Sequence, residues 1–381
     1  MFNYVFSILI LFLSFICQEI SCFEDDKFID VQTISNKFLD DSCLSLKNKK
    51  LPNWMLSQIQ KDFQKFKPFS VKDLELHFDN SERGLIYIRI RNNKVFFQYN
   101  TKNPQHSTGT YTRAIQKLIT QPETRIENGD FLVNLFDTVH SLINKYPILS
   151  ITKNFLSNDV LIPDRFAISK RKNRLMNDID KSCLEFPWEI KINKAFWIGA
   201  ANGKKLSKEC WRDNNRARLV LFSIDHPDII WAKFINIKIS KKVFSEMKDL
   251  DYLLSSDRIS PFDSCQYKYL LDVDGWSVGF ERCRWILRSN CVLIKQQSKH
   301  FQWYYSGLKP YVHYVPYKGD CSDLLEIITW LRKNEDEAKT IALNGRDFSK
   351  TYLDADTTFL YLYEVLKEYN KLNETIENLN Y

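Results

Sequence analysis

The sequence predicts an α/β protein built on parallel sheets, and three observations lead to this fold class. Short apolar runs of strand length alternate with helix-length segments along much of the chain. The 381 residues are enough for two domains of ordinary size. With 44% hydrophobic and 27% charged residues the composition is globular, and with only 10 glycines and 11 prolines it excludes collagen and global disorder.

The first segment, 1–22, is predicted to be a signal peptide rather than part of the fold. Its apolar run from Tyr4 to Cys17 has the length of a signal-peptide core and is short for a membrane span. An uncleaved anchor is the alternative, because the usual positive charges before such a run are missing. Both interpretations direct the chain into the secretory pathway.

The cysteines fit an oxidising compartment, in which disulfides are favoured. No C-x-x-C pair is present, which argues against zinc ribbons and thioredoxin chemistry. An odd number remains after the leader, so at least one thiol is expected to be free or bridged to another molecule: Cys43, Cys183, Cys210, Cys265, Cys283, Cys291 and Cys321. The sequon Asn373-Glu374-Thr375 is the predicted glycan site.

The first clear element along the chain is a β-hairpin. Ile86, Ile88 and Ile90 alternate with Tyr and Arg residues, Asn92-Asn93 supplies the turn, and 95–99 forms the returning strand. A helix is predicted next, at about 111–119.

Buried strands are predicted at six apolar runs: 131–136, 148–152, 195–199, 228–234, 269–273 and 291–294. Helices are predicted between several of them, at 215–222 and 282–287, whereas the charged stretch 169–181 is a surface helix or an interdomain connection. Three further helices follow, the first capped by Ser322 or Asp323, the second stopped by Gly345 and the third starting near Thr357.

The charge of the chain indicates an anionic ligand rather than nucleic acid. The net charge of +7 comes from 54 basic and 47 acidic residues spread along the sequence, and no basic-aromatic module is visible. None of the six histidines has a metal-binding spacing such as H-E-x-x-H.

The run 268–287 carries the clearest candidate for a binding loop. A strand ends in Asp272-Val273-Asp274-Gly275, and a loop of small residues then enters a helix. Ligands bind at the carboxyl ends of strands in open α/β sheets, and helix N-termini hold phosphates. The backbone around Gly279 is therefore predicted to bind a diphosphate, with Arg282 or Arg284 neutralising its charge. An ordinary βα turn is the alternative.

Three other places could carry chemistry. The segment 298–319 interleaves aromatic and basic residues, which suits stacking on a sugar or a base, or else interdomain packing. The segment 203–218 is basic, so Arg216 could bind a phosphate, or the segment could be a solvated face. Asp137 follows the strand 131–136 and could act as a general base or only cap a helix.

These pieces occur in an order that resembles glycosyltransferase family 90, the protein O-glucosyltransferases and their capsule-associated relatives. The resemblance rests on C-x-Y-K-Y-L-x-D-x-D-G-W-S at 265–277, VLIKQ at 292–296, W-Y-Y-x-x-L-K-P-Y-V-H-Y-V-P at 303–316, SDLLE at 322–326 and E-D-E-A-K-x-I-A-x-x-G at 335–345. It is weaker but collinear from about 95 to 235.

The resemblance implies a GT-B fold, in which two Rossmann-like domains face a cleft and helices follow at the C-terminus. The implied division is a leader at 1–22, an acceptor-side domain at 23–190, a UDP-sugar-binding domain at 191–350 and a C-terminal helix and tail at 351–381.

The resemblance also implies an activity: a single in-line displacement, with inversion, that moves glucose or xylose from a UDP-sugar to a hydroxyl. The implied acceptor is a protein serine, as in epidermal-growth-factor-like repeats. No metal or other cofactor is expected, and the protein is expected to be a monomer in the endoplasmic reticulum lumen or secreted.

Site residues carried over from the family motifs fall into three groups. Asp137 matches the catalytic base. Asp159, Pro163 and Phe166 match the acceptor side. The donor site matches Gly199, Ala200, Arg216, Asp274, Gly275, Trp276, Ser277, Val278, Gly279, Phe280, Glu281 and Arg282.

The sequence departs from the family pattern at the donor site. Ile198 and Ala200 replace an arginine and a serine, and Glu281 stands where many animal members have arginine, with Arg282 one place later. The sequence ends ENLNY, without a Lys-Asp-Glu-Leu-like motif, so both secretion and retention in the endoplasmic reticulum are kept as predictions. A carbohydrate-binding pseudoenzyme and a polysaccharide-directed transferase remain the alternatives.

Overall fold

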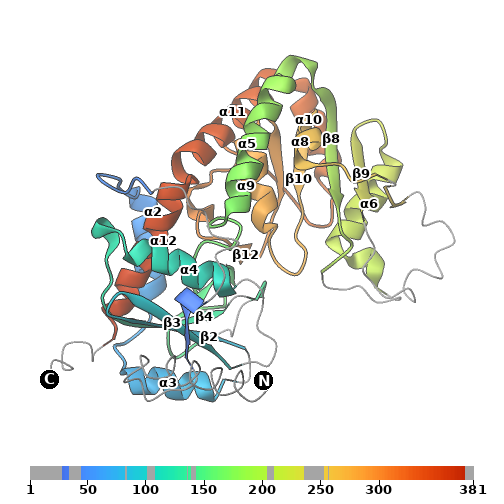
Figure 1. The fold of residues 1–381 in the computed structure, drawn as a ribbon. Coiled ribbons are helices and arrows are strands. Elements are labelled where there is room, and N and C mark those ends of the chain that lie inside the picture. The colour runs from blue at the N-terminus through green and yellow to red at the C-terminus, as the bar shows by residue number, and fades with distance from the viewer. Residues whose placement is uncertain are drawn as a thin grey trace, which may run out of the picture.

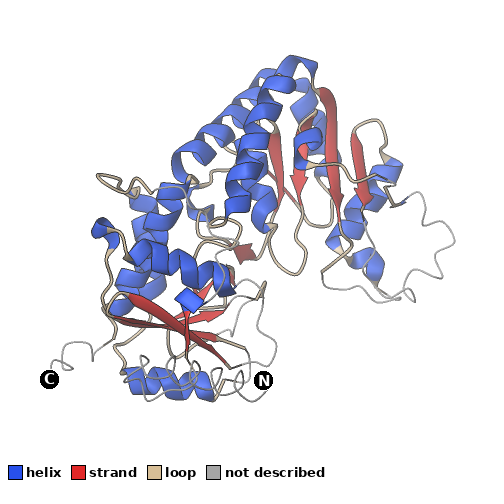
Figure 2. Cartoon of the chain, in the orientation of Figure 1, coloured by secondary structure: helices blue, strands red, loops and turns tan. Residues whose placement is uncertain are grey.

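The structure, a computed structural model, describes residues 28–33, 44–81, 84–100, 108–134, 136–138, 143–203, 210–235, 253–255 and 257–373. The predicted leader at 1–22 lies outside these residues. The described chain forms two halves, each built on its own sheet, with helices packed around the sheets (Figures 1 and 2). The predicted α/β fold class, with two domains facing each other, is confirmed.

The N-terminal half holds a six-stranded mixed sheet in the order β1-β3-β2-β4-β5-β7. Its strands β1, β2, β3 and β4 pair antiparallel, and β4, β5 and β7 pair parallel. This half is therefore less regular than a Rossmann-like domain, because the hairpin extends the parallel part. The strands are β1 (Ile29–Asp30), β2 (Ile86–Arg91), β3 (Lys94–Tyr99), β4 (Gly129–Asn134), β5 (Ile148–Ser150) and β7 (Val160–Leu161).

The predicted hairpin is present and its turn has the expected backbone. Asn92 and Asn93 both have positive φ, 49° and 61°, as a two-residue turn between right-twisted strands requires. Asparagine adopts this conformation more readily than most residues, so the turn residues set the register of β2 against β3.

The C-terminal half holds a five-stranded sheet that is parallel throughout, in the order β13-β11-β10-β8-β9. The carboxyl ends of the strands therefore meet at one edge, where ligands of α/β proteins bind. The strands are β8 (Ile192–Gly199), β9 (Ile230–Phe234), β10 (Tyr267–Asp272), β11 (Val292–Gln296) and β13 (Val315–Tyr317).

The helices cover these sheets and connect them. Those of the first half are α2 (Asn53–Phe63), α3 (Val71–Asp79) and α4 (Thr108–Ile119). The others are α5 (Lys170–Glu185), α6 (Asn215–Asp225), α8 (Pro261–Ser264), α9 (Phe280–Arg288), α10 (Leu324–Lys333), α11 (Glu335–Tyr352) and α12 (Ala355–Asn370). Short 3-10 turns lie at Val31–Thr33, Pro122–Thr124, Trp188–Ile190, Trp211–Asp213 and Tyr305–Gly307.

Two helices, α5 and α12, each pack on the half of the molecule opposite to the one that their position in the sequence suggests. α5 precedes the boundary predicted at 190 but packs on α8 and α9 of the C-terminal half. α12 returns to the N-terminal half, where it packs on α2 and β4 (Figure 1). Its Tyr369 hydroxyl donates to the Pro147 carbonyl at 2.9 Å and accepts from the Leu132 N–H at 3.3 Å.

A small antiparallel pair of strands also joins the two halves. β6 (Lys153–Asn154) belongs to the first half and β12 (His300–Phe301) to the second. The segment 298–319, singled out for its aromatic residues, thus takes part in interdomain packing.

The disulfides expected from an oxidising compartment are not present among the cysteines named here. Five cysteines carry free thiols, and no disulfide joins any two of them: Cys183, Cys265, Cys283, Cys291 and Cys321. Cys43 lies outside the described residues.

The predicted glycan site is buried in the folded chain. The side chain of Asn373 is 7% exposed, and its Nδ2 donates to the Asp130 carbonyl at 3.2 Å. None of the helices that the structure describes is long and apolar enough to cross a membrane.

The carboxylate of Asp130 organises the N-terminal sheet. It is fully buried, ion-paired with Arg89 at 2.9 Å and Arg91 at 2.7 Å, and it accepts the Tyr87 hydroxyl at 2.9 Å. Asp130→Ala is expected to lower the free energy of unfolding by about 3–5 kcal/mol, because it breaks a buried network of two ion pairs and a hydrogen bond. Urea unfolding measures this loss. The control is Glu127→Ala, which removes an exposed carboxylate paired with Arg125 and should lower the free energy of unfolding by less than about 1 kcal/mol. Equal losses of stability in the two variants would contradict the prediction.

Candidate active site

A cavity of about 470 Å³ opens at the carboxyl edge of the C-terminal sheet, next to the start of α9. It brings together three places that the sequence predicted separately: the carboxylate after β4, the arginine at the start of α6 and the turn after β10. The lining residues are Asp137, Phe166, Ile198, Asn202, Arg216, Ile235, Ile259, Pro261, Ser264, Gly275, Trp276, Ser277, Val278, Gly279, Phe280, Glu281, Arg282 and Trp285.

Arg216 is held by backbone carbonyls from the ends of two strands. Its Nη1 donates to Ala200 at 2.8 Å, Nη2 to Val273 at 3.3 Å and Nε to Asp274 at 3.2 Å. Asn214 caps α6 by accepting from the Arg216 and Ala217 N–H groups, which places the arginine in the first turn of the helix. Desolvation, and then the neighbouring charge of Arg282, lowers the pKa of Arg216 to about 10, so the side chain stays cationic at neutral pH.

Arg282 lies in the first turn of α9 and is held in the same way. Its Nη2 donates to the Ile198 carbonyl at 2.6 Å. The ring of Trp197 lies 5.8 Å from the guanidinium carbon of Arg216 and 5.7 Å from that of Arg282. Ile198 and Ala200, which the motif match predicted to stand in place of an arginine and a serine, contribute the carbonyls that hold these two arginines, and Ile198 also lines the cavity.

The wall of the cavity formed by α6 and the start of α9 is positively charged. Within the described residues neither Arg216 nor Arg282 forms an ion pair with a carboxylate, and no side chain caps the start of α9 after Gly279. The first N–H groups of α9 and the positive end of its dipole therefore add to the two arginines. Ser277 Oγ and Asn202 Oδ1 also lack hydrogen-bond partners although they are buried. Such an arrangement suits a diphosphate.

Two glycines allow the close packing of the turn. A Cβ on Gly275 would lie 2.5 Å from Asn202 Oδ1 and 2.9 Å from Arg216 Nη2. A Cβ on Gly279 would lie 2.1 Å from Asp272 Oδ1. Larger residues would displace the polar groups that face the cavity.

Asp137 lies on the other wall, contributed by the N-terminal half. Its side chain is exposed to the cavity. Although the residue is open to the cavity, partial desolvation by the surrounding protein raises the pKa of its carboxyl, Arg165 partly offsets this, and Asp164 adds to the rise. A carboxylate of raised pKa is a stronger base than an ordinary aspartate, as proton abstraction requires.

The predicted site residues outside the lining have other positions. Gly199 ends β8, Ala200 and Asp274 contribute the carbonyls that hold Arg216, and the Asp274 carboxylate accepts from Ser298. Glu281 lines the cavity but pairs with Arg171 at 3.2 Å.

On the predicted acceptor side, only Phe166 lines the cavity. Asp159 is fully buried, where it accepts from Ser150 at 3.0 Å and Asn144 at 3.2 Å, and burial raises its pKa to about 6. Pro163 accepts the Tyr111 hydroxyl through its carbonyl. Asp159 and Pro163 do not line the cavity.

Sequence reasoning missed part of the lining, namely Asn202, Ile235, Ile259, Pro261, Ser264 and Trp285. One local signal was available: Ser260 caps α8 by accepting from the Asp263 N–H, with Pro261 in the first turn, a pattern typical of a helix start. Nothing local indicates that this helix borders the cavity.

Asp272 lies beneath the turn and gives the fold a pH-dependent stability. It is 1% exposed, neither oxygen has a hydrogen-bond partner, and burial raises its pKa from 3.8 to about 6. The folded state thus favours the protonated form of Asp272. Its contribution to the free energy of unfolding is fully present below about pH 4 and is lost as the pH rises through about 6. Asp272→Asn is expected to raise the free energy of unfolding by about 3 kcal/mol at pH 8 relative to the native chain. Urea unfolding should show no such gain at pH 4, and an equal gain at both pH values would contradict the assignment.

Relatives of known sequence resemble this chain over most of its length. Protein O-glucosyltransferase 2 of Danio rerio is 27% identical over 349 residues, which cover 88% of this chain and 65% of that protein. Protein O-glucosyltransferase 3 of Homo sapiens is 27% identical over 333 residues, 82% of this chain and 61% of that protein. The chain thus spans less than two thirds of these curated relatives.

Among solved structures, a glycosyltransferase from Rickettsia africae has a TM-score of 0.36 at 10% identity, over 59% of this chain and 64% of that one. Anabaena Alr3699/HepE in complex with UDP and glucose has a TM-score of 0.34 at 14% identity, over 50% and 52%.

The family model described as "Glycosyl transferase family 90" matches residues 47–378, which contain every lining residue of the cavity and every strand of the two sheets except β1. The resemblance that the motifs indicated is confirmed, and the chain belongs to glycosyl transferase family 90.

Proposed function

We propose that the protein is an inverting glycosyltransferase that moves glucose or xylose from a UDP-sugar to a hydroxyl acceptor. The observation that carries this proposal is the shared cavity, in which the carboxylate of Asp137 lies across from Arg216, Arg282 and the uncapped start of α9. A base and an anion-binding wall facing one space are what displacement of a nucleoside diphosphate needs.

In this mechanism the diphosphate of the donor lies on the N–H groups at the start of α9, between Arg216 and Arg282. Asp137 takes the proton from the acceptor hydroxyl while that oxygen attacks the anomeric carbon from the face opposite the leaving UDP. The charge that develops on UDP is stabilised by the two guanidinium groups and the helix end, so we propose that no metal ion is required.

The proposed acceptor is a serine of a protein in the secretory pathway. Two of the relatives described above are named protein O-glucosyltransferases, and the N-terminal segment has the composition of a signal peptide. We propose that Asp137 is the catalytic residue. We also propose that the residues matched to the donor motifs of the family, from Gly199 to Arg282, form the donor site.

Turnover measurements test the proposal directly. The purified chain is incubated with UDP-glucose, UDP-xylose and other UDP-sugars, with epidermal-growth-factor-like repeats or an oligosaccharide as acceptor, and released UDP is measured. Transfer to the repeats is the expected result and should persist in EDTA. Transfer only to the oligosaccharide would make the enzyme polysaccharide-directed, and binding without turnover would make it a carbohydrate-binding pseudoenzyme.

The rate of transfer should depend on pH through Asp137. The base must be ionised, so kcat should rise as the pH rises through the elevated pKa of this carboxyl and then level off. A pH profile with its rising limb above the range of an ordinary aspartate is the expected result. A rate that does not fall at acidic pH, while the chain stays folded, would contradict the assignment.

A further inference from the structure

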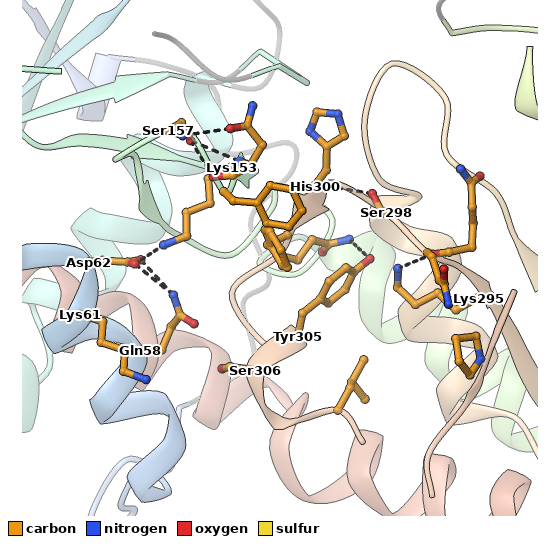
Figure 3. A pocket seen from close by; sticks show the side chains of 18 of the residues that line it. Gln58, Lys61, Asp62, Lys153, Ser157, Lys295, Ser298, His300, Tyr305 and Ser306 are labelled. Atoms are coloured by element: carbon orange, nitrogen blue, oxygen red, sulfur yellow. Dashed lines mark hydrogen bonds and ion pairs between the residues drawn. The ribbon is translucent and has the colours of Figure 1, made fainter. Parts of the chain in front are cut away.

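A second and larger cavity, of about 730 Å³, lies where the two halves meet. Its N-terminal wall comes from α2 and the segment 153–157, and its other wall from the carboxyl ends of β11 and β13 and the segment 300–308. Figure 3 shows Gln58, Lys61, Asp62 and Lys153 on one side and Lys295, Ser298 and Tyr305 on the other. This volume is within the ~300–1,000 Å³ range of small-molecule sites.

The cavity is separate from the donor cavity. The two linings share no residue. The turn at Asp274 divides them: its N–H donates to Gln296 Oε1 at 3.0 Å, and Ser298 Oγ donates to its carboxylate. The 298–319 segment, whose aromatic residues the donor site does not use, supplies much of the lining.

The walls combine polar groups with flat rings. Gln302 is 1% exposed, and its Nε2 donates to the Tyr305 hydroxyl, while its Oε1 is buried without a hydrogen-bond partner. A buried amide oxygen without a partner is costly, so a ligand hydroxyl at this wall would be stabilising. Phe155 is 67% exposed at the cavity and packs edge-on against Phe301 at 5.3 Å.

Amides and aromatic rings together are the surfaces that bind sugars, because amides exchange hydrogen bonds with hydroxyls and rings cover the apolar faces of pyranoses. The amide side chains of this cavity are Gln58, Gln64, Asn154, Gln296, Gln297 and Gln302.

The lining also has an excess of positive charge. The lining has four lysines and one carboxylate, that of Asp62, which pairs with Lys153 and accepts from Gln58 at 3.1 Å (Figure 3). The buried carboxylates of Asp272 and Asp274 lie close to Lys295, so Lys61 and Lys65 supply the excess charge. Lys295 is 6% exposed and lies 4.4 Å from the ring centre of Tyr305. Lys61 and Lys65 are exposed. A neutral sugar does not need this charge, whereas an acidic one would be attracted by it.

We propose that this interdomain cavity binds an acidic oligosaccharide. The rings of Phe155 and Phe301 contact its sugar faces, the amides of Gln58 and Gln302 bind its hydroxyls, and Lys61 and Lys65 bind its acidic groups. The site is independent of the transfer reaction, because it uses none of the residues assigned to donor binding or to catalysis.

Calorimetric titration of the full chain with trigalacturonic acid and with maltotriose tests the proposal. The acidic trisaccharide should bind, more weakly as salt is raised, and at least about tenfold more tightly than maltotriose. Phe155→Ala and Lys61→Glu should each weaken binding by about tenfold. The matched controls Leu156→Ala, at a residue 70% exposed, and Lys67→Glu, at an exposed lysine, lie outside the lining and should leave it unchanged.

Three results would overturn the proposal: no binding of either trisaccharide at millimolar concentration, equal binding of both, or binding of trigalacturonic acid that neither Phe155→Ala nor Lys61→Glu weakens. UDP titrated into the same variants should bind as it does to the native chain. A chain that binds trigalacturonic acid but shows no transfer would contradict the proposed function alone, so the two failures are distinguishable.

Discussion

Asp137→Asn is expected to lower kcat for sugar transfer by about 10²–10⁴-fold while leaving the affinity for UDP nearly unchanged. The amide has the shape of the carboxylate but cannot take a proton from the acceptor. In the proposed mechanism UDP lies on the opposite wall, around Arg216 and the start of α9, which the substitution leaves unchanged. Initial rates with saturating UDP-sugar and calorimetric titration with UDP measure the two quantities separately.

The matched control for this variant is Asp228→Asn. Asp228 is exposed shortly before β9 and lies outside both cavities, so its neutralisation should leave kcat within about twofold of the native value. If Asp137→Asn keeps the native turnover, or if it loses UDP binding to the same degree as turnover, the role of Asp137 as general base is wrong.

Arg216→Gln is expected to remove most of the stabilisation of the leaving diphosphate, a loss of about 10²–10³-fold in kcat together with weaker UDP binding. The glutamine carries no charge and cannot reach all three carbonyls that hold the guanidinium. Because these carbonyls orient the arginine before substrate arrives, the native chain needs little rearrangement to bind the diphosphate.

Arg218→Gln is the control, two residues further along α6. Its guanidinium pairs with the exposed carboxylate of Asp213 at 2.7 Å and lies outside the cavity lining. It should change UDP affinity by less than about threefold, the scale of a surface ion pair. Equal effects of the two substitutions would show that general positive charge, rather than the position of Arg216, accounts for binding.

The sequence predicted those parts of the fold that local patterns determine. The run at 131–136 marks β4, Asn92-Asn93 marks the hairpin turn, and the apolar runs of the second half mark four of its five parallel strands, β13 being the exception. The placement of α5 and α12 depends on which apolar faces meet across the whole chain, so periodicity alone could not predict it.

In the candidate site, too, some residues could be predicted from local sequence and others could not. The turn at 275–279 was predictable, because a strand end, small residues and a helix start lie within one short segment. Asp159 has the same residue type as Asp137 but lies in the core, where hydrogen bonds from Ser150 and Asn144 satisfy it. Ile235 and Ile259 reach the cavity only through tertiary packing, for which no local signal exists.

The return of α12 to the first sheet has a consequence for biosynthesis. Tyr369 hydrogen bonds to Leu132 and Pro147, so the N-terminal domain lacks part of its interior until the last helix has left the ribosome. The other domain has all five of its strands by Tyr317 and needs no later strand. The order of maturation during translation should therefore be the reverse of the order of synthesis, with the first-made half completed last.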